Sequence, residues 1–117
     1  MTELNVQKIE CVIKPFKLDE VRAALLQAGI TGMTAVEVRG FGRQRGHSEI
    51  FRGSEYATNF LPKIKIEIIV PEAQTHDVIQ LLMNAARTGD IGDGKIWVHP
   101  IQEVYRIRTG ESGEDAI

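Results

Sequence analysis

The stretch "KIKIEIIV", residues 63–70, shows the clearest two-residue alternation in this 117-residue chain. Every second residue from Ile64 to Val70 is apolar and falls on one face of an extended strand, because successive strand side chains point to opposite faces. Pro71 follows directly and is expected to end the strand. The stretch therefore predicts a half-buried β-strand whose apolar face needs a covering layer.

Two predicted helices, over 17–29 and 74–87, supply that covering layer. Both segments repeat apolar residues at helical spacing, and Gly29 is placed to stop the first helix. The side chains expected to face inward are Leu18, Val21, Leu25, Leu26, Val78, Leu81, Leu82 and Ala85. The sequence therefore predicts two amphipathic helices with polar outer faces.

Three more segments favour strands, over 8–13, 32–42 and 95–107, the last with a break at Pro100. The resulting element order is βαββαβ. This order is typical of an α+β, ferredoxin-like sandwich, in which two helices cover one face of a four-stranded antiparallel sheet. At this length the chain is expected to form a single domain.

The other face of the predicted sheet also carries apolar side chains, among them Val12, Met33 and Ile69. Large apolar patches on soluble proteins usually mark interaction surfaces. We therefore expect the protein to form oligomers through that face of the sheet.

The composition is that of an ordinary globular protein, with 43% hydrophobic and 26% charged residues. No apolar run approaches the roughly 20 residues of a membrane span, and segment 1–10 is unlike a signal peptide, so a cytoplasmic protein is expected. The net charge of −2 gives no general attraction to nucleic acid. Cys11, the only cysteine, lies in an apolar run and is expected to be buried rather than reactive.

Two segments combine glycine with basic residues more densely than ordinary turns do. Four of the eleven glycines lie in 40–53 and three in 89–94. Eight of the fourteen basic residues lie in or beside these segments: Arg43, Arg45, Arg52, Lys63, Arg87, Lys95, Arg106 and Arg108. Glycine lets backbone N–H groups converge on an anion that basic side chains neutralise, so the two segments predict a phosphate or carboxylate site. The alternative is a pair of solvated turns.

The segment "GDIGDGKI", residues 89–96, matches the first seven positions of a phosphate-binding P-loop. Ile96 replaces the Ser or Thr that binds magnesium in such loops, and the segment joins a helix to a strand instead of a strand to a helix. A Walker-type NTPase is therefore disfavoured. A slow ATP-hydrolysing domain, with Asp93 as its base, stays as an alternative function.

An RNA-binding module is a further alternative, because "RGFG", residues 39–42, begins like the RNA-binding strand of a fold with the same element order. Arg43 and Gly46 stand where that motif needs aromatic residues for base stacking, which argues against this interpretation. No catalytic residue set is apparent, and the three histidines are scattered along the chain.

The segments "IKPFKLDEVRAAL", "GMTAVEVRGFGRQRGH", "RGSEY", "FLPKIKIEIIV", "AARTGDIGDGKIWV" and "VYRIRTGE" together resemble the P-II nitrogen-regulatory signalling proteins. The resemblance runs without gaps from about residue 8 to residue 117. It implies a homotrimer of ferredoxin-like subunits that senses nitrogen, carbon and energy status. Each subunit would have an N-terminal extension (1–7), a T-loop (about 42–60), a B-loop (about 87–95) and a C-terminal loop (about 106–117).

The resemblance also implies clefts between subunits that bind ATP or ADP, with 2-oxoglutarate held through Mg²⁺ beside ATP. The implied nucleotide-binding residues are Thr34, Gly40, Arg43, Thr88, Gly89, Gly92, Asp93, Gly94, Lys95, Arg106 and Arg108, the last two from an adjacent subunit. The implied 2-oxoglutarate-binding residues are Gly42, Gln44, Arg45, Gly46 and Lys63. Gln44 would also complete the coordination of magnesium.

Two hydroxyl side chains of the T-loop resemble family modification sites. Ser54 corresponds to a position that is phosphorylated in cyanobacterial members, and Tyr56 to one that is uridylylated in many bacterial members. The targets that the resemblance implies are an ammonium transporter, N-acetylglutamate kinase, an adenylyltransferase or transcriptional regulators. It implies no nucleic-acid partner, and contact with a membrane only through a transporter.

Overall fold

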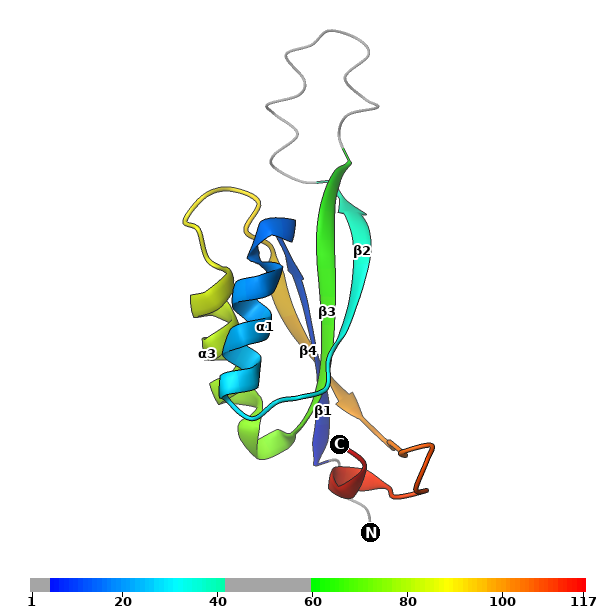
Figure 1. Ribbon diagram of the computed structural model, residues 1–117. Helices are drawn as coiled ribbons and strands as arrows, with labels where there is room; N and C mark the ends of the chain where they lie inside the picture. Colours follow the sequence, from blue (N-terminus) through cyan, green and yellow to red (C-terminus); the bar gives the residue numbers. More distant parts are fainter. Residues whose placement is uncertain (1–4, 42–59) are drawn as a thin grey trace, which may run out of the picture.

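The computed structural model describes residues 5–41 and 60–117 (Figure 1). Within these residues the helices and strands follow the predicted βαββαβ order. The strands are β1 (Val6–Ile13), β2 (Thr34–Gly40), β3 (Leu61–Pro71) and β4 (Lys95–Ile101). The helices are α1 (Leu18–Gln27) and α3 (Thr75–Ala86), with short 3-10 turns η1 (Pro15–Lys17), η3 (Glu72–Gln74) and η4 (Gly113–Ala116).

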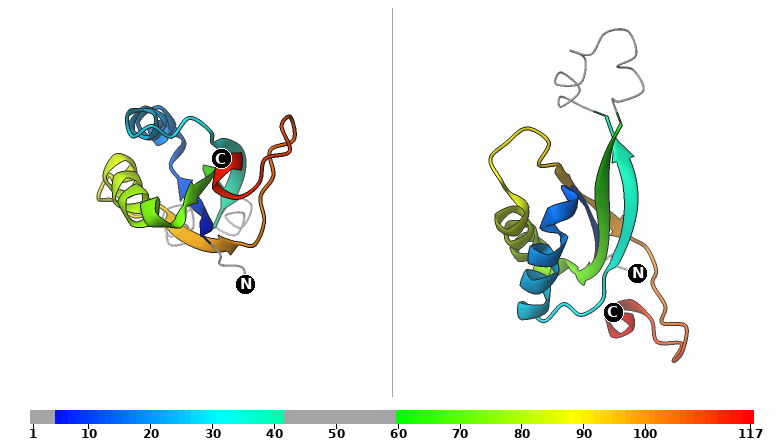
Figure 2. Two further views of the ribbon diagram at one scale, coloured as in Figure 1. Left: turned by 90° about the horizontal axis from the view of Figure 1, so that it is seen from below. Right: turned by 45° about the horizontal axis from the view of Figure 1, so that its top comes forward.

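The four strands form an antiparallel sheet in the order β2-β3-β1-β4. The central strand β1 therefore pairs with β3 on one side and with β4 on the other, although both lie far from it in sequence. Helices α1 and α3 lie side by side on one face of this sheet (Figures 1 and 2). This arrangement confirms the predicted ferredoxin-like α+β fold.

The core lies between the helices and the sheet. Its fully buried side chains come from alternate positions of the two central strands and from one stripe of each helix: Ile9, Cys11, Ile13, Ile66, Ile68, Val70, Val21, Leu25, Val78 and Leu82. Each large aliphatic side chain buried in this way contributes about 1.5–3 kcal/mol. Burial also raises the pKa of the Cys11 thiol to about 11, because the thiolate would lose its hydration. The prediction of a buried cysteine is confirmed.

Several predicted details are wrong. Leu26 is 49% exposed, because it is turned about 100° around α1 from its buried neighbour Leu25. Met33 packs against the helix-side core instead of lying on the opposite face of the sheet. Pro100 lies within β4 and pairs opposite Gln7, which an edge strand tolerates because one side of its backbone needs no ladder hydrogen bond. The strand ends one residue later, at Ile101, and does not continue to the predicted residue 107.

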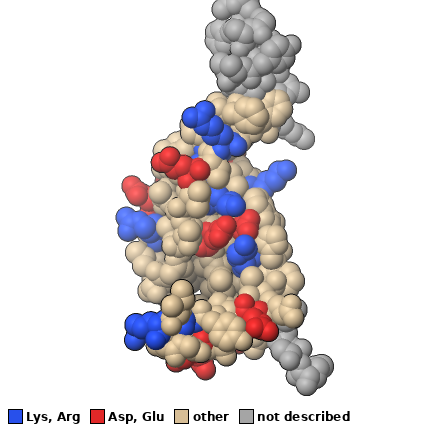
Figure 3. All heavy atoms as spheres, turned by 90° about the vertical axis from the view of Figure 1, so that its right-hand side faces the viewer, with Lys and Arg blue, Asp and Glu red and all other residues tan. Residues whose placement is uncertain are grey.

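The sheet face opposite the helices is mixed in character. Lysine, arginine and acidic side chains are interspersed with other residues on the view of Figure 3. Glu10 is buried on this face, where its carboxylate lies 2.8 Å from the Lys8 ammonium and 3.5 Å from the His99 ring. The hydrogen bond from Lys8 lowers the pKa of Glu10 below its usual value. The face therefore combines apolar side chains with paired charges.

None of the helices in residues 5–41 and 60–117 has the length and apolar character that a membrane-spanning helix needs.

Candidate functional site

The connection between α3 and β4, residues 88–94, forms a tight loop that we call the glycine loop. Its glycines at 89, 92 and 94 all have positive φ, at +94°, +97° and +104°. Gly94 also approaches β1 so closely that an added Cβ would lie 1.6 Å from the carbonyl oxygen of Val12. Only glycine combines this backbone angle with this close approach. The shape of the loop therefore requires glycine at position 94.

Asp93 organises the glycine loop from within. Its carboxylate accepts hydrogen bonds from the backbone N–H groups of Thr88 (2.8 Å) and Gly89 (2.9 Å), and a short one from the Thr88 hydroxyl. These hydrogen bonds, that of the hydroxyl first, hold the pKa of Asp93 well below its usual range. A carboxylate occupied by this many donors is a poor proton acceptor near neutral pH. This geometry argues against Asp93 as a general base.

Lys14 fastens the glycine loop to the sheet. It follows the last residue of β1, and its ammonium lies 3.2 Å from the Thr88 hydroxyl oxygen and 3.4 Å from the Asp93 carboxylate. The sequence reasoning missed Lys14, because 74 residues separate it from Thr88. The contact could have been predicted only from the pairing of β1 with β4, because that pairing brings the end of β1 beside the loop.

Lys63 reaches the glycine loop from β3. Its side chain is buried, and its ammonium donates a 2.7 Å hydrogen bond to the carbonyl oxygen of Gly92. Burial, and then the positive charge of Lys14, lower the pKa of Lys63, while Asp93 opposes this shift. Lys14 therefore contacts the Asp93 carboxylate, and Lys63 contacts the backbone carbonyl of the residue before it.

An open pocket of about 480 Å³ lies between the glycine loop and the ends of β1, β2 and β3. It is lined by Val12, Gly40, Phe41, Lys63, Asp90, Ile91, Gly92, Asp93, Gly94 and Lys95. The lining combines apolar side chains, two lysines, two aspartates and glycine backbone. Such a mixture suits a ligand with a flat apolar part and an anionic part. We take this pocket as the candidate functional site.

The pocket brings together six of the residues that the sequence singled out. From the nucleotide set these are Gly40, Gly92, Asp93, Gly94 and Lys95. From the 2-oxoglutarate set the pocket contains Lys63. Two further residues of the nucleotide set, Thr88 and Gly89, lie in the glycine loop and contact the Asp93 carboxylate without lining the pocket.

Three other predicted residues lie away from this pocket in the same chain. Thr34 begins β2 whereas Gly40 ends it, a separation of roughly 20 Å at about 3.3 Å per residue. Arg106 and Arg108 lie in the C-terminal segment, at the end of the molecule opposite the glycine loop (Figure 1). The Arg106 guanidinium is 3.2 Å from the Glu111 carboxylate and donates a 2.8 Å hydrogen bond to the Ile117 carbonyl oxygen.

The remaining predicted site residues lie outside the described part of the chain. They are Gly42, Arg43, Gln44, Arg45, Gly46, Ser54 and Tyr56. Among residues 5–41 and 60–117, no group of three or more His, Cys, Asp or Glu side chains is arranged to hold a metal ion.

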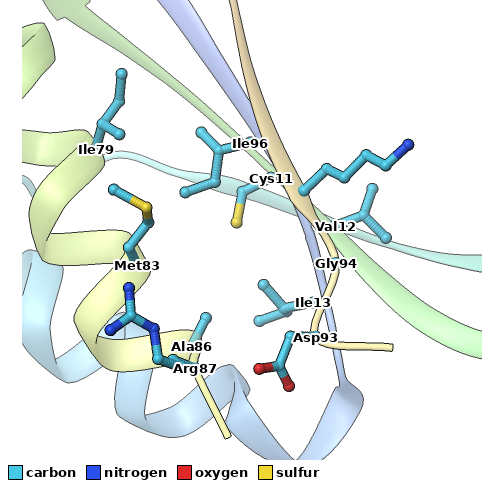
Figure 4. A pocket seen from close by; sticks show the side chains of 11 residues that line it. Cys11, Val12, Ile13, Ile79, Met83, Ala86, Arg87, Asp93, Gly94 and Ile96 are labelled. Atoms are coloured by element: carbon cyan, nitrogen blue, oxygen red, sulfur yellow. The ribbon is translucent and has the colours of Figure 1, made fainter. Parts of the chain in front are cut away.

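A second cavity, of about 310 Å³, lies behind the glycine loop, between α3 and the paired strands β1 and β4 (Figure 4). Its walls are mostly apolar, from Cys11, Ile79, Met83 and other core residues, and Arg87 and Asp93 lie at one end. It shares the Asp93–Lys95 wall with the first pocket but contains fewer of the predicted binding residues. We therefore place the candidate site in the first pocket.

Known proteins resemble this chain over nearly its whole length. Residues 6–111 match the family model described as "Nitrogen regulatory protein P-II". Proteins with that name from Pasteurella multocida and from Synechocystis sp. are each 59% identical over 112 residues, which cover 96% of this chain and all of the relative. A crystal structure of Arabidopsis thaliana PII bound to citrate is 40% identical, with a TM-score of 0.81, and covers 98% of this chain and 94% of that one.

The structural match covers 98% of the chain, and the sequence match, residues 6–111, includes the glycine loop and the strands β1, β2 and β3 beside the pocket. The relatives are named as regulatory proteins and not as enzymes. The chain therefore belongs to the P-II family of nitrogen regulatory proteins.

Proposed function

We propose that this P-II protein senses ATP or ADP together with 2-oxoglutarate, and reports their state through the segment between β2 and β3. The observation that supports the proposal is that the glycine loop, two lysines (Lys63 and Lys95) and the end of β2 line one open pocket. Both ligands are anions of intracellular metabolism, so we place this sensing in the cytoplasm.

The nucleotide would bind with its phosphates on the glycine loop. Backbone N–H groups in a turn with positive φ at several positions make a favourable cradle for phosphate oxygens. Lys95 lines the same pocket and supplies a positive charge. Phe41 and Ile91 supply apolar surface for the base. Polyphosphate binding is strongest where several such donors are held in place before the ligand arrives.

The 2-oxoglutarate would bind next to the phosphates, with one carboxylate on Lys63. A buried ammonium at the start of a rigid strand is a well-oriented partner for a carboxylate. The related Arabidopsis thaliana PII was crystallised with citrate, which is also a small polycarboxylate. With ATP bound, Mg²⁺ would be held by phosphate oxygens, by the keto acid and by Gln44, supplying positive charge between the anions. Gly42, Arg45 and Gly46 would complete this site.

The nucleotide site would be completed by a second subunit. The C-terminal segment that carries Arg106 and Arg108 lies at the end of the molecule opposite the glycine loop of its own chain (Figure 1). In a homotrimer the same segment of a neighbouring subunit would supply their positive charges to the phosphates, and Gly40 and Thr34 would line the side of the base and ribose. The mixed face of the sheet opposite the helices would be buried between subunits. Sedimentation equilibrium tests this assembly, and a monomer at micromolar concentration contradicts it.

The output would be the conformation of the T-loop, about residues 42–60. The chain leaves the pocket at Gly40 and returns at Leu61, which pairs opposite Gly40 in the sheet. The rings of Phe41 and Phe60 lie 5.7 Å apart at this exit. A ligand that contacts the start of the loop therefore selects among its conformations. By linkage, a target that prefers another conformation weakens ligand binding by the same factor, and couplings of about 1–3 kcal/mol suffice for a switch.

Targets would be bound through the outer part of the T-loop. The classes that we propose are an ammonium transporter, N-acetylglutamate kinase, an adenylyltransferase and transcriptional regulators. Ser54 and Tyr56 are the proposed modification sites, and a phosphate on Ser54 would add about −1.5 to −2 charge to the loop. Mass spectrometry of protein from nitrogen-starved and nitrogen-replete cells tests the two modifications.

Calorimetry tests the sensing function directly. We expect ADP and ATP to bind the wild-type protein, and 2-oxoglutarate to bind only when ATP and Mg²⁺ are both present. Gln44→Ala should abolish 2-oxoglutarate binding while largely sparing ADP. The matched control is Gln27→Ala, since Gln27 is exposed on α1 and does not line the pocket. Unchanged 2-oxoglutarate affinity in Gln44→Ala contradicts the proposed role of Gln44.

A further inference from the structure

We propose that Lys14 is a positioning residue for the nucleotide site, which holds the glycine loop in its phosphate-binding shape without touching the ligand. This inference rests on the proposed nucleotide binding and adds a residue to it. Lys14 belongs to neither of the glycine-rich segments, and its contacts appear only when the end of β1 is brought beside the loop.

The glycine loop has contacts within itself and separate contacts to the sheet. The hydrogen bonds from Thr88 and Gly89 to Asp93 join residues four or five positions apart, so they shape the loop internally. Lys14 comes from the end of β1 and contacts both Thr88 and Asp93. It therefore fixes that internal structure relative to the sheet.

Among residues 5–41 and 60–117, Lys14, Lys63 and Gly94 each join the loop to the sheet. Lys14 holds its beginning and the Asp93 carboxylate, and Lys63 holds the Gly92 carbonyl. Gly94 packs on the backbone of β1 at the end of the loop. Lys14 thus contacts the Asp93 carboxylate, on which the Thr88 and Gly89 N–H groups converge.

Lys14 also offsets a negative charge at the wall of the pocket. Asp93 lines the pocket where phosphates are proposed to bind, and its negative charge would repel them. The Lys14 ammonium lies 3.4 Å from that carboxylate and offsets its charge. Lys14 itself does not line the pocket, and its side chain is only 14% exposed. It therefore acts through Asp93 and Thr88 and not as a ligand-binding group.

The test compares Lys14→Met with Lys14→Arg and with the control Lys17→Met. The control is closely matched, because the Lys17 side chain is also 14% exposed and pairs over 3.2 Å with Glu20, away from the loop. Methionine keeps most of the apolar stem of lysine and removes its charge. Calorimetric titration with ADP should show about tenfold weaker binding for Lys14→Met, the effect of losing one charge-assisted hydrogen bond. Lys14→Arg should recover most of the affinity, and Lys17→Met should match the wild type.

A second measurement reports on the loop without any nucleotide. Hydrogen exchange of the Thr88 and Gly89 amides, which donate to Asp93, should accelerate in Lys14→Met and not in Lys17→Met. A double-mutant cycle with Asp93→Asn should be non-additive for ADP affinity, because the neutral amide no longer repels phosphate once Lys14 is lost.

The inference is overturned if Lys14→Met binds ADP as tightly as the wild type, or if Lys17→Met weakens binding as much. Additive effects of Lys14→Met and Asp93→Asn also overturn it, as does failure of Lys14→Arg to recover affinity. If the wild-type protein binds no ADP, the proposed nucleotide function fails. The exchange measurement then still decides whether Lys14 holds the loop, and unchanged exchange in Lys14→Met overturns that claim too.

Discussion

The ammonium of Lys63 donates a 2.7 Å hydrogen bond to the carbonyl oxygen of Gly92, so strand β3 is joined directly to the glycine loop. Lys63 lies two residues after Leu61, where the chain re-enters the sheet from the proposed T-loop. One side chain thus contacts the loop proposed to bind phosphate and lies beside the segment proposed to signal. A carboxylate ligand bound at Lys63 would therefore contact a residue that adjoins both the glycine loop and the T-loop. This is the physical basis of the proposed coupling between ligand binding and T-loop conformation.

Lys63→Met should abolish 2-oxoglutarate binding, because it removes the ammonium proposed to hold a carboxylate. Calorimetry in the presence of ATP and Mg²⁺ measures this. Lys65→Met is the matched control, since Lys65 lies on the same strand but pairs with Glu67 over 3.4 Å and does not line the pocket. Retention of 2-oxoglutarate binding by Lys63→Met would show that the carboxylate site lies elsewhere.

Gly94→Ala should destabilise the protein strongly. The new Cβ would lie 1.6 Å from the Val12 carbonyl oxygen, at a backbone φ of +104°. We expect a loss of more than about 2 kcal/mol in the free energy of unfolding by urea, together with loss of ADP binding. Gly89→Ala is the control, because its φ of +94° carries similar backbone strain but nothing lies within 4 Å of the added Cβ. Equal costs at the two positions would contradict the close approach at Gly94.

Stability should depend on pH through Asp93. The pKa of this carboxyl is held below its unfolded value by the Thr88 and Gly89 donors and by Lys14, so the charged form favours the folded state. Its contribution is fully present above the ordinary aspartate pKa near ~4 and is lost as the pH falls toward the depressed folded-state pKa.

Urea midpoints measured from pH 6 down to pH 2 test this dependence. Asp93→Asn should show a shallower loss of stability with acid than the wild type. Asp19→Asn, at a side chain that is 91% exposed, should follow the wild-type curve. Identical acid profiles for wild type and Asp93→Asn would refute the proposed contribution.

Cys11 should be unreactive in the folded protein. Its side chain is 1% exposed, and burial raises its thiol pKa to about 11, so roughly one thiol in a thousand is ionised at pH 8. A thiol–disulfide reagent at pH 8 should label it rapidly in concentrated urea and hardly at all without urea. Rapid labelling of the native protein would mean that the strand β1 core opens readily.

Two leucines test the helix-side core. Leu82→Ala removes a fully buried side chain of α3 and should cost about 2–5 kcal/mol of unfolding free energy. Leu26→Ala removes a side chain of α1 that is 49% exposed, and should change stability by about 0.5 kcal/mol or less. Urea unfolding of both variants measures the difference, and similar costs would contradict the observed burial.

Local patterns were sufficient for most of the fold. Period-two alternation in β3 assigned Ile66 and Ile68 to the core correctly, and helical spacing did the same for Val21 and Leu82. The wrong predictions for Leu26 and Pro100 concern residues whose surroundings depend on a neighbouring element. Leu26 follows the helical apolar pattern, but the sheet covers only one side of α1. Pro100 looks like a break, but an edge strand leaves one side of its backbone unpaired.

The sequence by itself determined the element order, the glycine loop and the family, because each depends on residues that are close together in the chain. Apolar periodicity, glycine content and contiguous motifs can be recognised without knowing the tertiary contacts. Only the tertiary structure decided which side chains meet around the loop. Lys14 and Lys63 stand 49 positions apart in the chain, and both reach residues 88–93 because β1 pairs with β3 on one side and with β4 on the other. Strand pairing between distant segments depends on the packing of the whole sheet, and no local pattern encodes the contacts that it creates.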